Sequence, residues 1–171
     1  MIPPERTVRT GRATGVRIEP VLSTALLAEL LSPGQELWLV SPWISDVVVL
    51  DNSRGDYDNL VSEALARTYR LSGVLAALAE SGSLVTVVIR PDGHNERFRE
   101  TLRRRVADQV RVVEDVDVHE KTLCGENWLL SGSMNFTLRG MQVNDEAMSY
   151  RLDPTAAAQA RLDFTRRWGK S

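Results

Sequence analysis

The run Leu84-Val85-Thr86-Val87-Val88-Ile89 constrains the fold more than any other stretch of the chain. It is a continuous apolar strand without polar alternation, so we expect both of its faces to be buried in a sheet. The segment before it, Asn59–Glu80, is predicted to be helical, with a break at Ser72-Gly73 as the alternative. The segment after it, Glu96–Ala107, is predicted to be a basic helix.

Other periodic segments extend this alternation of helices and strands. The other predicted helices are Pro20–Leu31 and Pro154–Trp168, the latter opened by Asp153-Pro154. The other predicted strands are Glu36–Val40, Val47–Leu50, Val110–Val113, Val116–Cys124, Trp128–Leu130 and Ala147–Leu152. Gly125-Glu126-Asn127 is a predicted hairpin turn, and Met134–Gly140 one or two helical turns. We therefore predict an α/β fold, in which a mixed, mostly parallel β-sheet is flanked by helices on both faces.

The first residues differ in composition from the rest. Residues 1–17 contain several arginines together with prolines and glycines. We predict a flexible basic N-terminal arm over 1–17 and a single domain over 18–171, and contact of the arm with a phosphate backbone is the functional alternative.

Composition excludes little. The net charge of -2 gives no overall attraction to nucleic acid or to an anionic membrane, although a local basic patch is compatible with it. The single cysteine, Cys124, cannot form an intrachain disulfide, which favours a reducing compartment. The start of the chain lacks a signal-peptide pattern, and no apolar run approaches about 18 residues. We therefore expect a cytoplasmic protein without stable membrane association.

The residues suited to chemistry gather in Val118–Ser149. His119 and Lys121 are two residues apart, so on a strand they share one face with Leu123. A lone histidine is usually a surface or satisfied core residue, but an adjacent lysine disfavours the imidazolium and keeps a ring nitrogen available for attack.

Ten residues after Lys121 come Gly132-Ser133-Met134-Asn135, and Asn144-Asp145-Glu146 follow. Gly132-Ser133 can be an ordinary turn before a helix, or it can let the backbone approach a phosphate while Ser133 and Asn135 donate to its oxygens. Glu146 is either an exposed strand carboxylate or the group that accepts a hydrogen bond from a histidine.

This pattern resembles the HxK…GSxN signature of the phospholipase D superfamily, and the upstream Ser41-Pro42-Trp43-Ile44 is similar to that family as well. The family has Asp where this chain has Glu126, at the predicted hairpin. The resemblance implies the fold of that family and a metal-independent phosphodiesterase. It implies that His119 attacks phosphorus to form a phosphohistidine, that Lys121 and Asn135 hold the phosphoryl oxygens, and that Glu146 orients a histidine. Ser133, Ser41, Trp43 and His94 are the implied substrate contacts.

The family mechanism uses two histidine units, and this chain has one, because His94 lacks a neighbouring lysine motif. We therefore expect a homodimer that joins two copies of His119 across a two-fold axis. With two histidines and one cysteine, the chain lacks an ordinary zinc ligand set, and no metal or other cofactor is expected.

The leading hypothesis is a nuclease that acts on DNA in preference to RNA. The arginines of 96–107 could form a surface that contacts successive phosphates, or they could simply be a solvated helix face. The chain also resembles the short phospholipase D-like DpdK proteins of bacterial clusters that modify DNA with deazaguanine and restrict unmodified DNA. That likeness implies partner proteins of an antiphage defence system. The alternatives are a non-catalytic dimeric nucleic-acid-binding or scaffold component, and a phospholipid phosphodiesterase or transferase.

Overall fold

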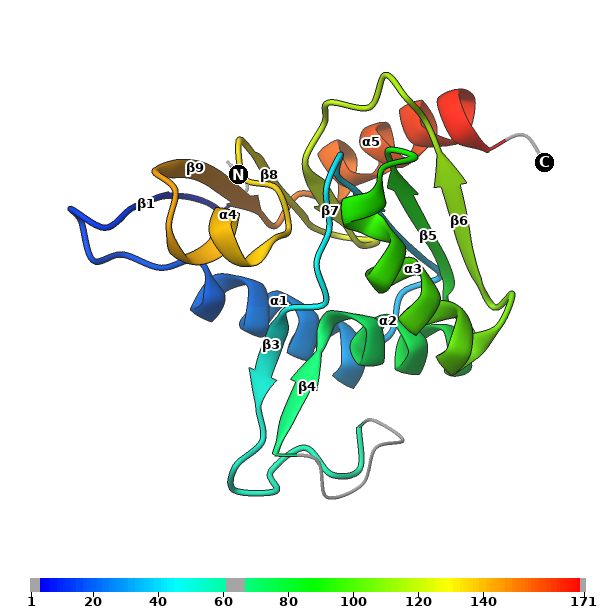
Figure 1. Ribbon diagram of the computed structural model, residues 1–171, viewed down its shortest axis with the longest axis horizontal. Helices are drawn as coiled ribbons and strands as arrows, with labels where there is room; N and C mark the ends of the chain where they lie inside the picture. The colour runs from blue at the N-terminus through cyan, green and yellow to red at the C-terminus, as the bar shows by residue number, and fades with distance from the viewer. Residues whose placement is uncertain (1–3, 61–66, 170–171) are drawn as a thin grey trace.

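A seven-stranded sheet organises the computed structural model, which describes residues 4–60 and 67–169 (Figure 1). Its strand order is β1-β9-β8-β7-β2-β5-β6. The strands are β1 (Glu5–Thr10), β2 (Glu36–Val40), β5 (Leu84–Ile89), β6 (Val110–Glu114), β7 (Thr122–Cys124), β8 (Leu129–Gly132) and β9 (Glu146–Arg151). The helices are α1 (Glu19–Leu31), α2 (Leu71–Glu80), α3 (Gly93–Val106), α4 (Leu138–Gln142) and α5 (Pro154–Trp168). A separate hairpin, β3 (Val48–Asp51) and β4 (Thr68–Arg70), projects beyond α1 and α2.

The sheet is mixed, which confirms the predicted α/β class. Strand β2 pairs parallel with β5, and β5 pairs parallel with β6. The β2–β7, β7–β8, β8–β9 and β1–β9 pairs are antiparallel. The antiparallel share is larger than predicted, in part because the link 125–128 between β7 and β8 is too short for the crossover that parallel strands require.

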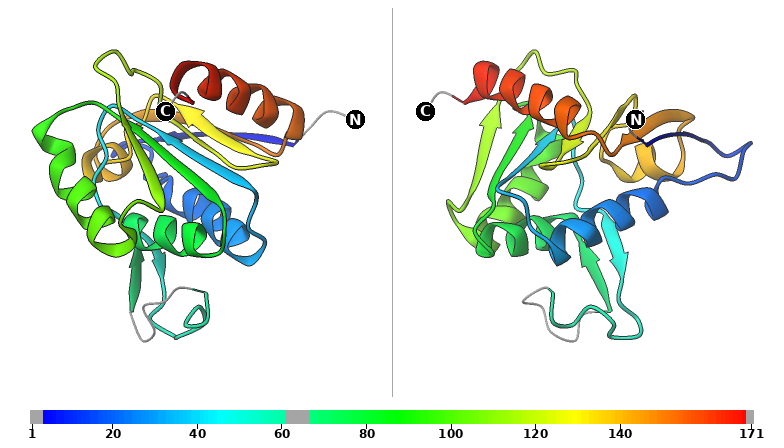
Figure 2. Two further views of the ribbon diagram at one scale, coloured as in Figure 1. Left: turned by 90° about the vertical axis from the view of Figure 1, so that its right-hand side faces the viewer. Right: turned by 180° about the vertical axis from the view of Figure 1, so that it is seen from behind.

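Helices cover both faces of the sheet, as predicted (Figure 2). On one face, α1, α2 and α3 contribute the larger apolar core, in which Leu26, Leu75 and Phe98 are almost fully buried. On the other face, α5 packs Phe164 and Trp168 into a smaller core with Trp38, Val88 and Val118. Strand β5 is buried on both faces, since Val87 faces the first core and Val88 the second.

The prediction of a flexible arm over 1–17 is wrong for Glu5–Thr10, which forms β1 and pairs with β9 from Glu5↔Arg151 to Thr10↔Glu146. Val8 is buried in the larger core, which anchors this edge strand. Such a pairing spans almost the whole chain, so local composition cannot reveal it. Residues 1–3 of the predicted arm lie outside the described residues.

The prediction of a helix over Asn59–Glu80 holds only for its second half. Residues 59–60 lie in a turn, and Thr68–Arg70 forms β4, whose Tyr69 is fully buried. Helix α2 begins at Leu71, next to a hydrogen bond from the Ser72 main-chain N–H to the Asp46 carboxylate at 2.9 Å. The predicted helical residues 61–66 lie outside the described residues.

The predicted strand Val116–Cys124 is shortened to β7. The Asp115 carboxylate accepts a 2.8 Å hydrogen bond from the Asp117 main-chain N–H, which forms a turn there. His119 and Lys121 therefore lie in the connection before β7 and do not share a strand face with Leu123, which is fully buried. The helical turn predicted at Met134–Gly140 instead begins at Leu138, after Thr137, whose hydroxyl accepts from the Gly140 N–H at 3.1 Å.

Three predicted elements match at both ends: Glu36–Val40, Leu84–Ile89 and Pro154–Trp168. The last begins where its sequence indicates, because the Asp153 carboxylate accepts from the main-chain N–H groups of Thr155 and Ala156, each at 3.0 Å. No helix within 4–60 and 67–169 has both the length and the apolar character required to cross a membrane.

Candidate active site

Strand pairing brings the predicted site segments to one edge of the sheet. Val40, near the end of β2, is opposite Val88 of β5 and Thr122 of β7. Thr122 is in turn opposite Ser131 of β8. The segments that follow β2, β5 and β8 therefore meet the segments that precede β7 and β9. This edge carries Ser41, Trp43, Arg90, His119, Lys121, Ser133, Asn135 and Glu146.

His119 and Lys121 lie at the entrance to β7. The His119 side chain is exposed, and Lys121 is half-buried. The Lys121 ammonium donates to the main-chain carbonyl oxygen of His119. The main-chain carbonyl oxygen of Lys121 accepts from the Gly132 N–H at 3.2 Å, which ties this segment to β8. The structure therefore places the histidine, the lysine and the start of the GSxN turn next to one another.

Arg90, which was not among the predicted site residues, contacts His119 directly. Its Nη2 lies 3.2 Å from Nδ1 and 3.1 Å from Nε2 of His119, so it can donate to whichever ring nitrogen carries the lone pair. Its Nε donates to the Val118 carbonyl oxygen at 3.2 Å, and its guanidinium lies 5.1 Å from the Trp43 ring centroid. Arg90 follows the buried strand Leu84–Ile89, and the carboxyl ends of parallel strands are where ligands usually bind. The position of Arg90 directly after that strand is the sequence signal that could have identified it.

Gly132 must be a glycine because a Cβ there would lie 2.0 Å from the Ala147 carbonyl oxygen of β9. In this structure the missing side chain of Gly132 lets the backbone approach the neighbouring strand β9, whereas the sequence suggested an approach to a phosphate. After it, Asn135 accepts a 3.4 Å hydrogen bond from the Ser41 hydroxyl at Oδ1, which leaves its amide hydrogens for another acceptor. Ser41 is fully buried and positions Asn135 in this structure, and its predicted contact with a substrate stays a prediction.

Glu146 lies at the start of β9 beside the GSxN turn. It accepts hydrogen bonds from the Ser133 hydroxyl and, at 3.2 Å, from the Asn144 amide. The Ser133 oxygen also accepts from the Ala147 N–H at 3.0 Å. In this chain Glu146 therefore holds the turn, and its predicted contact with a histidine stays a prediction.

His94 lies in the first turn of α3, and its ring makes its hydrogen bond with Ser45 and not with His119. Its Nε2 is 3.1 Å from the Ser45 hydroxyl oxygen. The next residue, Asn95, is 2% exposed and holds the loops together. Its amide donates to the carbonyl oxygens of Pro42 and Arg90, each at 2.9 Å, and accepts from the Ile44 N–H at 2.8 Å. Asn95 thus fixes the β2 loop, which carries Trp43, against the loop of Arg90.

The site is rich in donors for an anion. Arg90, Lys121 and Asn135 supply cationic or amide donors around one histidine, an arrangement suited to a phosphoryl group. Within the described parts of the chain, no three His, Cys, Asp or Glu side chains gather as metal ligands would.

Comparison with protein families gives a match over residues 26–168 to a model described as "Cardiolipin synthase, PLD-like domain". The chain belongs to the phospholipase D superfamily. Comparison with curated proteins gives no match.

Solved structures share this phospholipase D-like fold at low sequence identity. Nuc, a phospholipase D family member from Salmonella typhimurium, is 16% identical with a TM-score of 0.61, over 98% of this chain and 95% of its own. NucT from Helicobacter pylori is 10% identical with a TM-score of 0.62, over 95% of each chain. A polyphosphate kinase from Porphyromonas gingivalis is 15% identical with a TM-score of 0.65, over 98% of this chain but 26% of its own. The chain thus matches Nuc and NucT over nearly their whole length.

The C-terminal helix of this phospholipase D-like domain anchors the segment that carries His119. The Trp168 indole N–H donates to the Asp115 carboxylate at 2.7 Å, and Arg167 forms a 2.9 Å ion pair with Glu120. The Trp168 hydrogen bond, followed by that from the Asp117 main-chain N–H, lowers the pKa of Asp115 below its ordinary 3.8.

We predict that Asp115→Asn lowers the free energy of unfolding at pH 7, and that the difference disappears in acid. A carboxyl whose pKa is lowered in the folded state stabilises the fold above its unfolded pKa and loses that contribution as the pH falls through its folded pKa. Urea unfolding of both proteins from pH 7 down to about pH 2.5 measures this. A difference that stays constant over the whole range would contradict the assignment.

Proposed function

We propose that this protein is a metal-independent phosphodiesterase that cleaves nucleic acid through a phosphohistidine on His119, at a site completed by a second copy of the chain. The observation that carries the proposal is the gathering of His119, Lys121, Arg90 and Asn135 at one edge of the sheet. One nucleophile and several phosphate donors are present there, with one such unit in the chain.

In the proposed first step, a ring nitrogen of His119 attacks phosphorus. The new P–N bond forms as the P–O bond to the leaving alcohol breaks, and the leaving oxygen takes a proton from His119 of the second copy. That second imidazole then removes a proton from water, whose oxygen attacks phosphorus and releases the first histidine. Proton transfer by a positioned histidine of this kind contributes about 10²–10⁴-fold to a rate.

Lys121, Arg90 and Asn135 would hold the phosphoryl oxygens during both steps. Without substrate, the Arg90 guanidinium lies against the ring nitrogens of His119. A phosphodiester is a stronger acceptor than a neutral imidazole, because it carries a full negative charge. Its arrival would draw Arg90 from the ring to a phosphoryl oxygen, which frees the nitrogen for attack.

Two features support a two-copy site. Within the described residues, the ring of His119 makes its hydrogen bonds with Arg90, and the other histidine, His94, makes its own with Ser45, so the two imidazoles of one chain do not contact each other. The chain also matches Nuc and NucT over 95% of their lengths, which fits a protein built from one such unit.

A second candidate is phospholipid phosphodiester cleavage or transfer. It is favoured by the description of the matching family model, which names cardiolipin synthase. The same histidine chemistry serves both substrates, so only the group that the enzyme accepts separates them. The role in a DNA-modifying defence system with partner proteins stays a prediction of the sequence resemblance.

We predict that the protein cleaves labelled DNA in excess EDTA and that His119→Ala abolishes this cleavage. The reason is that the proposed nucleophile is a side chain and needs no metal ion. Single- and double-stranded DNA, RNA and a phospholipid vesicle are compared by gel and thin-layer assays. Cleavage that EDTA abolishes would sink the phosphohistidine mechanism, phospholipid turnover alone would favour the second candidate, and binding without turnover would favour a scaffold.

We predict that Arg90→Ala lowers kcat/KM roughly 10²-fold, as loss of one transition-state donor does. Arg90→Lys should recover part of this loss, because it restores the charge without the planar fork. Arg139→Ala is the matched control, since Arg139 is an exposed arginine on α4. Unchanged kinetics in Arg90→Ala would remove this residue from the mechanism.

We predict that activity falls with the square of the wild-type fraction when wild-type and His119→Ala chains are unfolded together and refolded as mixed dimers. Equal amounts then retain about one quarter of the activity, because a symmetric dimer needs both histidines. Light scattering measures whether the refolded protein is a dimer. A linear fall to half, or a fully active monomer, contradicts the shared site.

A further inference from the structure

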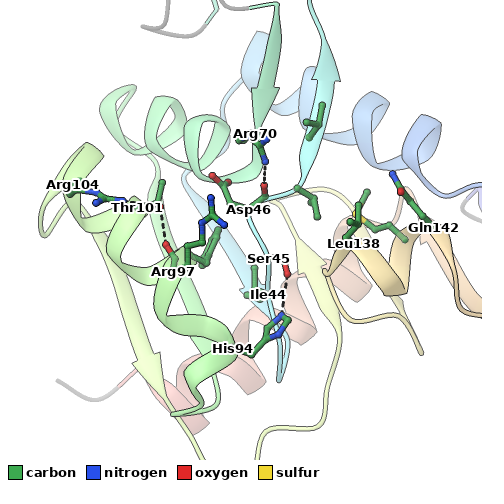
Figure 3. A pocket seen from close by; sticks show the side chains of 14 residues that line it. Ile44, Ser45, Asp46, Arg70, His94, Arg97, Thr101, Arg104, Leu138 and Gln142 are labelled. Atoms are coloured by element: carbon green, nitrogen blue, oxygen red, sulfur yellow. Dashed lines mark hydrogen bonds between the residues drawn. The ribbon is translucent and has the colours of Figure 1, made fainter.

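A groove of about 720 Å³ lies beside the candidate site, between α3 and α4 (Figure 3). Its floor is the segment Ile44-Ser45-Asp46, which continues directly from Ser41 and Trp43 of the site. The Ser45 N–H donates to the Phe136 carbonyl oxygen at 2.9 Å, one residue beyond Asn135. The groove therefore begins at the site, with His94 near Ser45 at this end.

Three arginines line this groove and are available to an anion. Arg97 and Arg104 are seven residues apart on α3, so they lie on the same helix face, about 10 Å apart along its axis. Arg70 reaches the groove from β4 and donates to the Asp46 main-chain carbonyl oxygen. All three are exposed, and within the described residues none of them forms an ion pair with a carboxylate.

Other arginines of α3 face elsewhere. Arg99 pairs with both Glu96 and Glu114, which neutralise it. Arg103 lies with Arg99 and Asp108 on the side of the helix away from the groove. The structure thus divides the basic helix into a groove face, where Arg97 and Arg104 form no ion pair within the described residues, and an opposite face that is mixed in charge. The groove also contains the carboxylate of Asp46, which accepts a hydrogen bond from the Ser72 main-chain N–H.

The lining between these cations is apolar. Val48 is 41% exposed and Leu138 is 56% exposed, which is high for side chains of this kind, and Phe98 and Met141 lie beneath. A DNA duplex keeps the faces of its bases stacked inside, so it offers phosphates, sugars and base edges to such a surface but no base faces. A single strand offers both phosphates and unstacked bases, whose faces pack against apolar side chains.

We propose that this groove binds a single strand of nucleic acid and leads it to the phosphodiester site. The guanidinium groups of Arg70, Arg97 and Arg104 contact successive phosphates, and the exposed Val48 and Leu138 contact the bases. The inference rests on the proposed function, because it names the substrate class of that same site. It adds that the groove, which lies outside the reacting groups, makes the protein prefer unpaired strands.

Binding is measured by fluorescence anisotropy with labelled oligothymidylate of about 20 nucleotides, longer than the 4–16 nucleotides that one binding domain usually covers. All proteins carry His119→Ala, so the probe stays intact. We expect Arg97→Ala/Arg104→Ala to weaken binding of the single strand at least roughly tenfold near 0.1 M salt, and to reduce the salt slope by about 1.4, since each phosphate contact contributes about 0.7. The Kd for a duplex of equal length should change no more than in the control.

The matched control is Arg103→Ala/Arg166→Ala, which removes the same charge from exposed positions outside the groove. A second variant, Leu138→Ser, should weaken single-strand binding several-fold and leave the salt slope unchanged, because it removes a base contact. Equal losses in variant and control, or equal losses for duplex and single strand, overturn the proposal. Failure of the wild type to cleave DNA would count against the proposed function alone, because these binding measurements need no turnover.

Discussion

The whole site depends on the two different pairings of strand β2. It runs parallel to β5 on one side and antiparallel to β7 on the other. A parallel neighbour ends where β2 ends, whereas an antiparallel neighbour begins there. The change of direction at β2 therefore collects Trp43, Arg90 and His119 from three distant parts of the chain at a single edge. Loops could not hold this arrangement alone, and buried Asn95 supplies the additional hydrogen bonds that join them.

The sequence predicted those parts of the fold and site that depend on a local motif or a local apolar run. It did not predict the contacts between residues that are far apart in the chain. The buried run Leu84–Ile89 predicted its own strand correctly, because nothing but a two-sided core accommodates such a run. The HxK…GSxN spacing identified the superfamily, which the family match confirms. Strand β1 and the Arg90–His119 contact were not predicted, because each depends on a partner 29 or more positions away. The predicted strand Val116–Cys124 was also too long at its start. A turn between Asp115 and Asp117 occupies its first residues, although the alternation of polar and apolar residues had suggested a strand there.

Charge in this protein is organised locally and does not follow its net value. The chain carries a net charge of -2, yet its site edge and the adjoining groove present arginine, lysine and amide donors. Acidic residues neutralise arginines elsewhere, as at Arg99 and Arg167. Ion pairs on the surface contribute little to stability, but they decide which cations remain free to meet an anion. An acidic isoelectric point is therefore compatible with a phosphate-handling surface.

The groove of Arg97 and Arg104 also bears on which of two identical His119 residues would attack phosphorus and which would protonate the leaving oxygen. In the proposed dimer, a two-fold axis would relate the two copies of this groove, which would then run in opposite directions past the shared site. A nucleic acid strand has a 5′ and a 3′ end, and it can enter only one of the two grooves in a given orientation. The strand itself would then break the symmetry. Its polarity would decide which His119 meets phosphorus and which faces the leaving oxygen, although the two histidines are chemically the same before it binds.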